Sequence, residues 1–254
     1  MDVVEATWEK RNLGVDTMEV SLSDEDLRLG ERELMGKIRG IEETYHPGYM
    51  VVRIPEGRPT IGLAMAQQGF WKIETQIGLV SERKDMEEAW KRCRRFQRDI
   101  HIEMAATEAD CEEIIRQVQQ GMFVTDRIAL DPAFGIPVAN LRYANWIRDE
   151  FERGTTIYFV SVGERRIGFN MEVVKDNRKH GLLGGVFLES QKLGVFLDVA
   201  ETERNLALGI AEVHFSVSSN NLAVLRLHEQ FGFRVDDIVG IYVKHLRFME
   251  ESDG

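Results

Sequence analysis

The period of the hydrophobic pattern after residue 99 is the feature that most constrains the fold. It alternates between strand-like and helix-like spacing in the order strand, two helices, three strands, helix, strand, helix, strand. This order predicts an α/β (α+β) fold. The predicted strands cover residues 100–104, 156–162, 166–174, 184–188, 213–217 and 238–245, and the predicted helices cover residues 107–118, 138–151, 195–208 and 221–231.

The first part of the chain predicts a smaller α/β unit. A helix from Ser81 to Arg98 joins this unit to the rest, because apolar residues recur there at helical spacing. We therefore predict two domains, a small one over residues 1–98 that ends in this linker helix, and a larger one over residues 99–254. In the small domain the predicted strands cover residues 18–22, 49–54 and 70–79, and the predicted helices cover residues 31–43 and 60–68.

The linker helix is basic on the faces that its apolar residues leave free. Two interpretations stay open, a patch that binds an anion and a solvated helix face between two domains. Its basic residues are Arg83, Lys84, Lys91, Arg92, Arg94, Arg95 and Arg98.

Composition limits the classes of function. Of the 254 residues, 43% are hydrophobic and 30% are charged, which excludes a disordered chain, a collagen-like chain and a coiled coil. The net charge of −11 argues against a nucleic-acid partner. No apolar run approaches the roughly 20 residues of a membrane span, and the N-terminal segment lacks the apolar region of a signal peptide. We expect a cytoplasmic protein with no membrane partner, and whether it forms a homodimer stays open.

The cysteines and histidines do not predict a metal site. Cys93 and Cys111 are the two cysteines, and their spacing fits no metal or redox motif. The histidines show no spacing typical of metal ligands. We expect two reduced thiols and no bound metal.

Two segments in the second part resemble motifs of the GNAT superfamily of acyl-CoA-dependent N-acyltransferases. Residues 185–196, GVFLESQKLGVF, look like the fourth strand of that family and its loop Q/R-x-x-G-x-G/A. Residues 221–233, NLAVLRLHEQFGF, look like the family's segment N-x-x-A-x-x-L-Y-x-x-x-G-F. The resemblance implies a mixed, mostly antiparallel sheet flanked by helices, and an enzyme that transfers an acyl group from acyl-CoA to an amine.

Shorter stretches are similar to the TDP-fucosamine acetyltransferases, sugar N-acetyltransferases that carry an extra N-terminal domain. This similarity implies transfer of an acetyl group from acetyl-CoA to a primary amine, by direct attack on the thioester and without a covalent enzyme intermediate. The favoured acceptor is an amino sugar linked to a nucleotide, so the expected partner is a small-molecule amine. The stretches are Trp8, Gly14, the predicted strand 49–54, Gly69-Phe70, residues 126–132 and residues 143–147.

The resemblance to GNAT enzymes also implies where acetyl-CoA binds as co-substrate. Amides of a short strand at residues 184–188 pair with the pantetheine arm, and N–H groups at the start of the next helix face the pyrophosphate. Gly194 lets the backbone approach closely, and an ordinary strand-to-helix turn is the alternative. The implied cofactor-binding residues are Val186, Phe187, Leu188, Gln191, Lys192, Leu193, Gly194, Val195, Phe196 and Asn221.

Two positions depart from the family pattern. Phe196 stands where the loop has Gly or Ala, and its ring either blocks the pyrophosphate or points away from it. His228 stands where the pattern has Tyr, which the resemblance implies to be the general acid for the departing thiolate. An imidazole can also transfer a proton at neutral pH, and a packing histidine is the alternative. Asn221 either caps the same helix or contacts the pantetheine arm, and the two roles are compatible.

The resemblance further implies residues on the acceptor side. Glu74 is the second catalytic candidate, as the base that takes the proton of the amine. The alternative is a glutamate on a solvated strand face, in which case a chain of waters can carry the proton to solvent. Arg127 is the candidate partner of a nucleotide phosphate, and Tyr143 and Trp146 are candidates for stacking on a base or sugar. Helix packing and a surface arginine are the alternatives.

Two other functions stay open. The ring of Phe196 and the hydrophobic strand at residues 184–188 are compatible with a reshaped groove that accepts a longer acyl group. The residues Phe196 and His228 are also compatible with a degenerate domain that binds CoA or a partner without catalysis.

Overall fold

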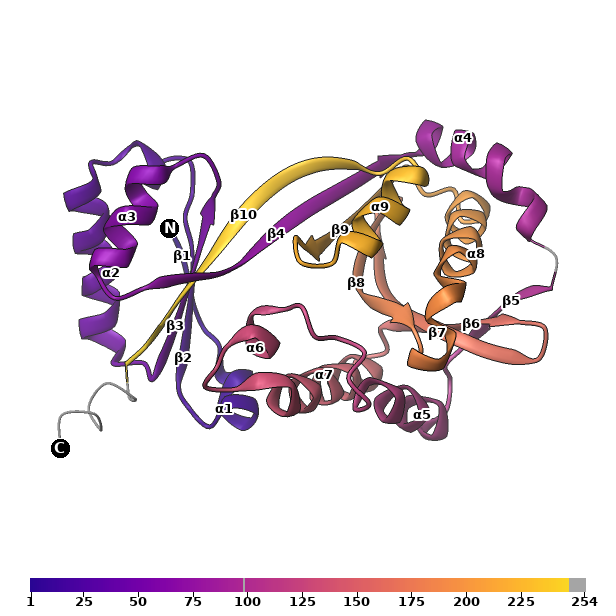
Figure 1. Ribbon diagram of the computed structural model, residues 1–254, viewed down its shortest axis with the longest axis horizontal. Coiled ribbons are helices and arrows are strands. Elements are labelled where there is room, and N and C mark those ends of the chain that lie inside the picture. Colours follow the sequence, from indigo (N-terminus) through magenta and orange to yellow (C-terminus); the bar gives the residue numbers. More distant parts are fainter. Residues whose placement is uncertain (98, 247–254) are drawn as a thin grey trace. The chain divides into compact units, whose positions relative to one another are not determined.

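The computed structural model describes residues 1–97 and 99–246, and its contacts divide the chain into two compact units. The first unit contains Met1–Gln76, Asp126–Val138 and Asp237–Gly254, and the second contains Ile77–Thr125 and Ala139–Asp236. Each unit is therefore built from separate stretches of sequence, and this division differs from the predicted boundary after residue 98. Figure 1 shows the helices and strands in the colours of the sequence.

The first unit holds a sheet in the order β1-β2-β3-β10. The pair β2–β3 is parallel, and the pairs β1–β2 and β3–β10 are antiparallel. Helices α2 and α3 cover one face, where Leu34, Ile38 and Met65 pack against Val20 and Met50. The elements are β1 (Asp2–Glu5), α1 (Thr7–Leu13), β2 (Thr17–Ser21), η1 (Asp26–Arg28), α2 (Glu31–Tyr45), β3 (Tyr49–Pro55), α3 (Pro59–Gln67) and α6 (Arg127–Leu130), with the first part of β4 (Trp71–Glu82) and most of β10 (Arg234–His245).

The second unit holds a sheet in the order β9-β8-β7-β6-β5. All neighbouring strands are antiparallel except β8 and β9, which run parallel. Helices α5 and α7 pack on one face and α8 packs on the other. The elements are the later part of β4, α4 (Arg83–Cys93), η2 (Arg94–Phe96), β5 (Ile100–Met104), α5 (Glu108–Val118), most of α7 (Gly135–Glu152), β6 (Thr156–Val162), β7 (Arg165–Lys175), β8 (Arg178–Val186), η3 (Leu188–Leu193), α8 (Gly194–Ala207), β9 (Glu212–Ser218), α9 (Leu222–Gln230) and the start of β10.

The predicted order of elements after residue 99 is confirmed apart from the short helix α6, which was not predicted. The mixed, mostly antiparallel sheet flanked by helices is confirmed. The predicted strands 100–104 and 156–162 match β5 and β6 residue for residue. The helix predicted after Thr107 begins with a capping box, in which the Thr107 hydroxyl accepts from the Asp110 N–H and the Asp110 carboxylate accepts from the Thr107 N–H. These elements were predictable because period and capping are local signals.

Other elements were missed or begin elsewhere. Strand β8 begins at Arg178 and ends at Val186, whereas the prediction was residues 184–188. The early half of β8 reads RKHG, which has no apolar pattern, and it forms a strand by pairing with β7 and burying Lys179 among charged partners. Strand β1 and helix α1 were not predicted.

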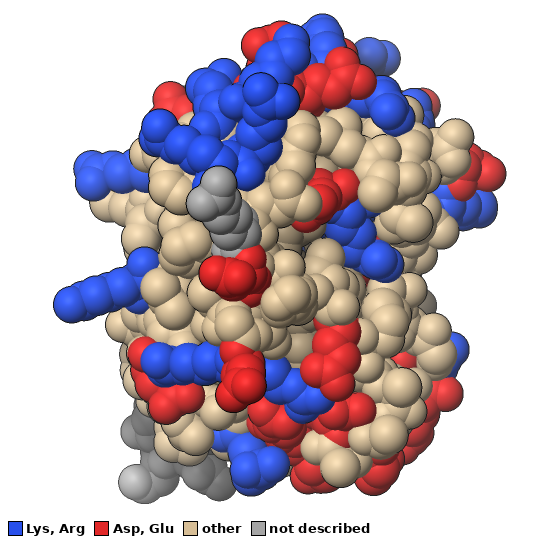
Figure 2. All heavy atoms as spheres, turned by 90° about the vertical axis from the view of Figure 1, so that its right-hand side faces the viewer, with Lys and Arg blue, Asp and Glu red and all other residues tan. Residues whose placement is uncertain are grey.

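The predicted linker helix is observed as α4, followed by the short η2 turn. Met86, Ala89 and Cys93 are its buried residues. The basic side chains face solvent, and Figure 2 shows Lys and Arg gathered over the end of the molecule where α4 lies. Some are neutralised locally, as Arg83 is by Glu87 at 3.0 Å. The anion-binding interpretation stays a prediction, and its last residue, Arg98, lies outside the described residues.

Among the described residues, no helix is long and apolar enough to cross a membrane. Cys93 and Cys111 are both free and buried. The described part of the chain contains no cluster of three or more His, Cys, Asp or Glu side chains arranged to hold a metal ion.

The contact between β7 and β8 requires glycine at position 168. A Cβ atom on Gly168 would lie 2.4 Å from the carbonyl oxygen of Gly185, which is backbone and cannot move without separating the strands. We expect Gly168→Ala to lower the free energy of unfolding by about 1–3 kcal/mol, measured by thermal or denaturant unfolding.

Gly194→Ala is the matched control for this prediction. Gly194 has helical backbone angles, and a Cβ atom there would make an ordinary 3.5 Å contact with Leu227. The control should keep or raise the midpoint, since alanine favours a helix by up to about 1 kcal/mol over glycine. Equal stability of the Gly168→Ala variant and the original chain would contradict the close approach of β7 and β8.

Candidate functional site

Strands β8 and β9 separate after a short paired stretch. Their parallel pairing covers Arg178 with Glu212, Lys179 with Val213, and His180 with His214. Beyond His180, strand β8 stays paired with β7 as far as Val186, but it pairs no further with β9. The backbone N–H and C=O groups on the β9 side of residues 181–186 therefore have no partner in that strand. An unpaired strand edge of this kind can bind an extended ligand through its amides.

Small residues and a bulge accompany this separation. A Cβ atom on Gly181 would lie 3.3 Å from the Cβ atom of Phe215, so glycine makes room for that side chain. The register of β7 and β8 shifts between Met171 and Glu172. A bulge bends the strand that carries the extra residue, and here it lies at the level where β8 leaves β9.

The unpaired edge of β8 leads into the N-terminus of α8. The η3 turn carries the exposed Gln191 and Lys192, and α8 begins at Gly194 with no side-chain cap. The first N–H groups of an uncapped helix can bind an anion, and the helix dipole favours it. Gly194 has φ −53° and ψ −35°, so the backbone conformation does not require glycine there.

The predicted cofactor residues divide into two groups. The side chain of Phe187 is buried in the core of the second unit, beside Phe159 and Phe169. Its N–H donates to the Ile167 carbonyl at 2.8 Å and its C=O accepts from the Ser190 N–H at 2.7 Å, so its backbone groups are also hydrogen bonded within the protein. The backbones of Val186 and Leu188 and the half-buried Leu193 and Val195 lie at the end of β8, in η3 and at the start of α8. Their predicted contact with CoA stays a prediction.

The ring of Phe196 packs into the protein. It lies in an apolar cluster with Val160, Ile167 and Ala200, and its ring centroid is 6.4 Å from that of Phe96. Of the two interpretations left open by the sequence, the structure favours the one in which the ring points away from the start of α8. Phe196 therefore gives no reason to exclude a pyrophosphate there.

His228 lies on α9 between two aromatic rings and one carboxylate. Its ring centroid is 4.6 Å from that of Phe215 and 5.2 Å from that of Phe233. Its Nδ1 atom is 2.8 Å from Oδ1 of Asp198 on α8. Asp198 Oδ1 lies off the direction of the ring N–H bond, so the contact is an ion pair rather than a well-directed hydrogen bond.

The environment of His228 favours its charged form. Burial opposes the charge of the ring, but the carboxylate of Asp198 outweighs this effect and raises the pKa of His228 above its usual value. The Nδ1 atom is buried, whereas the side chain as a whole keeps 14% of its surface exposed. Nε2 is the ring nitrogen that takes no part in the contact with Asp198.

A cluster of buried charges lies beside this pair, between the sheet and α8. Lys179 on β8 is 1% exposed, and its Nζ atom is 2.7 Å from Glu172 on β7 and 2.6 Å from Glu201 on α8. The Tyr158 hydroxyl donates to Glu172 at 3.1 Å, and Arg204 also contacts Glu172 at 3.1 Å. Burial opposes the charge of Glu201, but Lys179 outweighs it and lowers the pKa of Glu201. We call these side chains, Tyr158, Glu172, Lys179, Glu201 and Arg204, the α8 charge cluster.

The capping role predicted for Asn221 is confirmed. Its side-chain oxygen accepts from the Val224 N–H at 3.4 Å, at the N-terminus of α9. The cap fixes the start of the helix that carries His228 two turns later. Its predicted contact with the pantetheine arm stays a prediction.

Tyr143 and Trp146 belong to a row of aromatic side chains on α7. Tyr143 is buried with its ring 4.8 Å from that of Phe123, and the half-buried Trp146 stacks on Tyr143 at 6.4 Å. Phe123 also lies close to β8, since a Cβ atom on Gly185 would be 3.5 Å from its ring. The aromatic side chains therefore begin next to β8, the strand whose edge toward β9 is unpaired after His180. Contact of Tyr143 and Trp146 with an acceptor stays a prediction.

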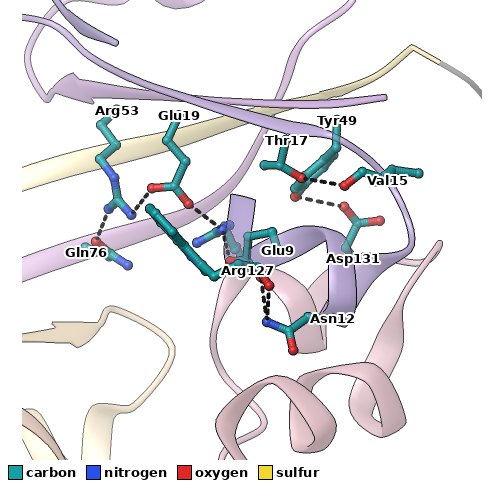
Figure 3. A network of polar contacts seen from close by, with 11 residues as sticks. Glu9, Asn12, Val15, Thr17, Glu19, Tyr49, Arg53, Gln76, Arg127 and Asp131 are labelled. Carbon is teal, nitrogen blue, oxygen red and sulfur yellow. Dashed lines mark hydrogen bonds and ion pairs between the residues drawn. The ribbon is translucent and has the colours of Figure 1, made fainter. Parts of the chain in front are cut away.

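Arg127 is a buried ion-pair partner in the first unit. It is 4% exposed, and its guanidinium is 3.0 Å from Glu9 and 2.7 Å from Glu19. Figure 3 shows this network, in which Glu19 also meets Arg53. The interpretation of Arg127 as a surface arginine is wrong, because its guanidinium is buried in ion pairs with two carboxylates, one from α1 and one from β2. Its predicted contact with a phosphate stays untested.

Glu74 is also buried. It lies on β4 in the first unit and is 4% exposed, so the interpretation of a glutamate on a solvated strand face is wrong. Glu74 lies in the segment FWKIETQI, and sequence alone does not show what covers its face of β4. Its predicted role as a base stays untested.

Three residues of the site were not predicted from the sequence. Lys179, Asp198 and Glu201 lie in segments without a motif, and a lysine in a strand or an acid on a helix ordinarily faces solvent. The helical spacing of Asp198 and Glu201, three residues apart, was the available signal, but it does not reveal partners on β8 and α9.

The burial of Arg127 gives a prediction for the first unit. Arg127→Met leaves Glu9 and Glu19 without their buried counterion, so we expect a loss of about 3–5 kcal/mol in the free energy of unfolding. Arg165→Met is the control, because its contact with Glu189 is half exposed, and it should change stability by less than about 0.5 kcal/mol. Equal unfolding midpoints for the two variants would show that Arg127 is not structural.

Comparisons with known proteins give the fold. No family model matches the chain, and no curated protein matches it. A GCN5-related N-acetyltransferase from Sphaerobacter thermophilus superposes with a TM-score of 0.62 at 12% identity, over 96% of this chain and 75% of that one. A conserved protein of unknown function from Staphylococcus epidermidis gives 0.58 at 13% identity, over 91% and 84%. A tandem GNAT protein from the clavulanic acid biosynthesis pathway gives 0.52 at 13% identity, over 84% and 68%. These likenesses show that the chain has the fold of the GCN5-related N-acetyltransferases.

Proposed function

We propose that the protein is an N-acyltransferase that moves the acetyl group of acetyl-CoA to a primary amine. The observation that carries this proposal is the separation of β8 from β9 after His180, because it leaves a strand edge that runs into the uncapped start of α8. The shared fold with GCN5-related N-acetyltransferases supports the same class of reaction.

The residues present fit the chemical features of acetyl-CoA. The pantetheine arm carries amides, which match the unpaired N–H and C=O groups of residues 181–186. The pyrophosphate is an anion, which matches the start of α8 and the neighbouring exposed Lys192. The inward packing of Phe196 leaves that end of the helix accessible.

His228 is the proposed proton donor. In the reaction the amine nitrogen forms a bond to the acetyl carbon, the carbon–sulfur bond breaks, and the thiolate takes a proton from Nε2 of His228. The contact with Asp198 and the raised pKa of His228 support this role, since both keep a proton available on the ring. The amine loses its proton to a base, for which Glu74 and a chain of waters are the proposed routes.

The acceptor is proposed from the sequence resemblance. An amino sugar linked to a nucleotide is the first amine to test. The half-buried ring of Trp146 is compatible with stacking on such a molecule, whereas Arg127 already holds two carboxylates. A simple alkyl amine is the comparison, and a longer acyl-CoA tests the reshaped-groove interpretation.

The first experiment is thermal unfolding with and without acetyl-CoA. A ligand at about one hundred times its Kd stabilises the native state by roughly 2.7 kcal/mol. We expect a rise in the midpoint, followed by release of free CoA thiol when the amine is added. The absence of both a shift and thiol release, in a folded protein, would reject the proposal.

His228→Phe tests the proton donor. Phenylalanine keeps a flat ring between Phe215 and Phe233 but has no proton to give, so we expect turnover to fall about 10²–10⁴-fold. The shift of the midpoint with acetyl-CoA should remain. Glu229→Gln, an exposed neighbour on α9, is the control and should keep normal turnover. Thiol release by His228→Phe at the rate of the control would exclude His228 as the donor.

A further inference from the structure

The proton on His228 is linked to the charge balance of the cluster around it. The α8 charge cluster and Asp198 together contain three acids, namely Asp198, Glu172 and Glu201, and two bases, Lys179 and Arg204. With neutral His228 this interior group carries a net charge of −1, and with protonated His228 it carries none. Net charge in a poorly solvated region is costly, so the surroundings favour a proton on the ring.

The neighbours of His228 on each packed element agree with this count. Asp198 and Glu201 face it from α8, and Lys179 from β8 is the cation that opposes them. Phe215 on β9 and Phe233 contribute rings without charge. Cys93 on α4 lies within range of Asp198, but burial raises the pKa of its thiol, so it adds no charge at neutral pH.

The pair of Asp198 and His228 also determines which nitrogen carries the proton. When the pair is neutral overall, either the ring is protonated on both nitrogens or Asp198 holds the proton against Nδ1. In both arrangements Nε2 carries a hydrogen that it can donate. When the pair loses that proton, the remaining hydrogen stays on Nδ1 beside the carboxylate, and Nε2 becomes an acceptor.

We propose that Asp198 is a positioning residue that keeps Nε2 of His228 in its proton-donating form, with Glu201 acting in the same direction from the next turn of α8. The kinetic part of this proposal rests on the proposed function, in which His228 protonates the thiolate. The titration part does not, because it concerns the ring in the free protein. Asp198 acts through His228 and touches no reacting atom.

The test is the titration of His228 in the full chain, followed by the NMR signal of its ring C–H, with the signal assigned by its loss in His228→Phe. In the original chain we expect the pKa above the ordinary value of 6.5. Asp198→Asn keeps the shape but removes the charge, so burial should then dominate and bring the pKa below 6.5. Glu201→Gln should lower it in the same direction by less, and it remains informative if Asp198→Asn does not fold.

Glu229→Gln is the matched control, since it removes an exposed charge from the residue next to His228 and should leave the titration unchanged. A titration of His228 at the same pH in the original chain, Asp198→Asn and Glu201→Gln would overturn the proposal. If the titration shifts but no chain releases thiol, the proposed function fails and the positioning by Asp198 stands.

Turnover gives the second readout. Loss of the proton from the pair should set the alkaline limb of the pH profile of kcat, and Asp198→Asn should move that limb to lower pH. Each unit by which the pKa falls reduces the protonated fraction on that limb about tenfold. Turnover of Asp198→Asn should therefore recover toward normal as the pH is lowered. A loss of the same factor at every pH would indicate a merely structural role and would overturn the kinetic part.

Discussion

The buried ammonium group of Lys179 is the interaction on which the second unit depends. It sits one residue before the last paired position of β8 and β9, and it joins β7, through Glu172, to α8, through Glu201. A buried cation without its partners costs several kcal/mol, so these three elements are held together where the sheet opens. The opening of the sheet after His180 is thus bounded by a charged contact rather than by a weak end of the strand.

Helix α8 connects this structural contact to the candidate chemistry. Its first turn begins without a side-chain cap, and its second turn carries Asp198 against His228 and, three residues later, Glu201 against Lys179. A shift of α8 along its axis would change all three contacts together. The position of His228, the proposed proton donor, relative to the proposed anion site is therefore set by one rigid element, which is the kind of support that a reactive geometry needs.

The sequence predicted the parts of the fold that local signals determine. Strand β5 alternates apolar and polar residues, β6 is a short run of β-branched and aromatic residues, and α5 begins at a capping box, so their bounds followed from the residues themselves. The beginning of β8 did not follow, because Lys179 behaves as a core residue only when Glu172 and Glu201 are brought to it by other elements. The same reason explains Arg127 and Glu74, whose burial depends on neighbours distant in sequence. The two motif segments predicted His228 and the turn that leads into α8 as parts of the site. Asp198 had no signal in the sequence beyond its helical spacing from Glu201.

The two departures from the motif pattern have compensating surroundings. At position 196 the larger side chain packs against Ala200 and near the ring of Phe96, away from the start of α8, which has no side-chain cap. At position 228 the imidazole is accompanied by an acid that can hold its proton, which a phenol with an ordinary pKa near 10 does not need. A buried Asp198 beside a neutral ring would be an uncompensated charge. Histidine at 228 and aspartate at 198 are therefore energetically coupled, and replacing either one alone changes the electrostatics of the other.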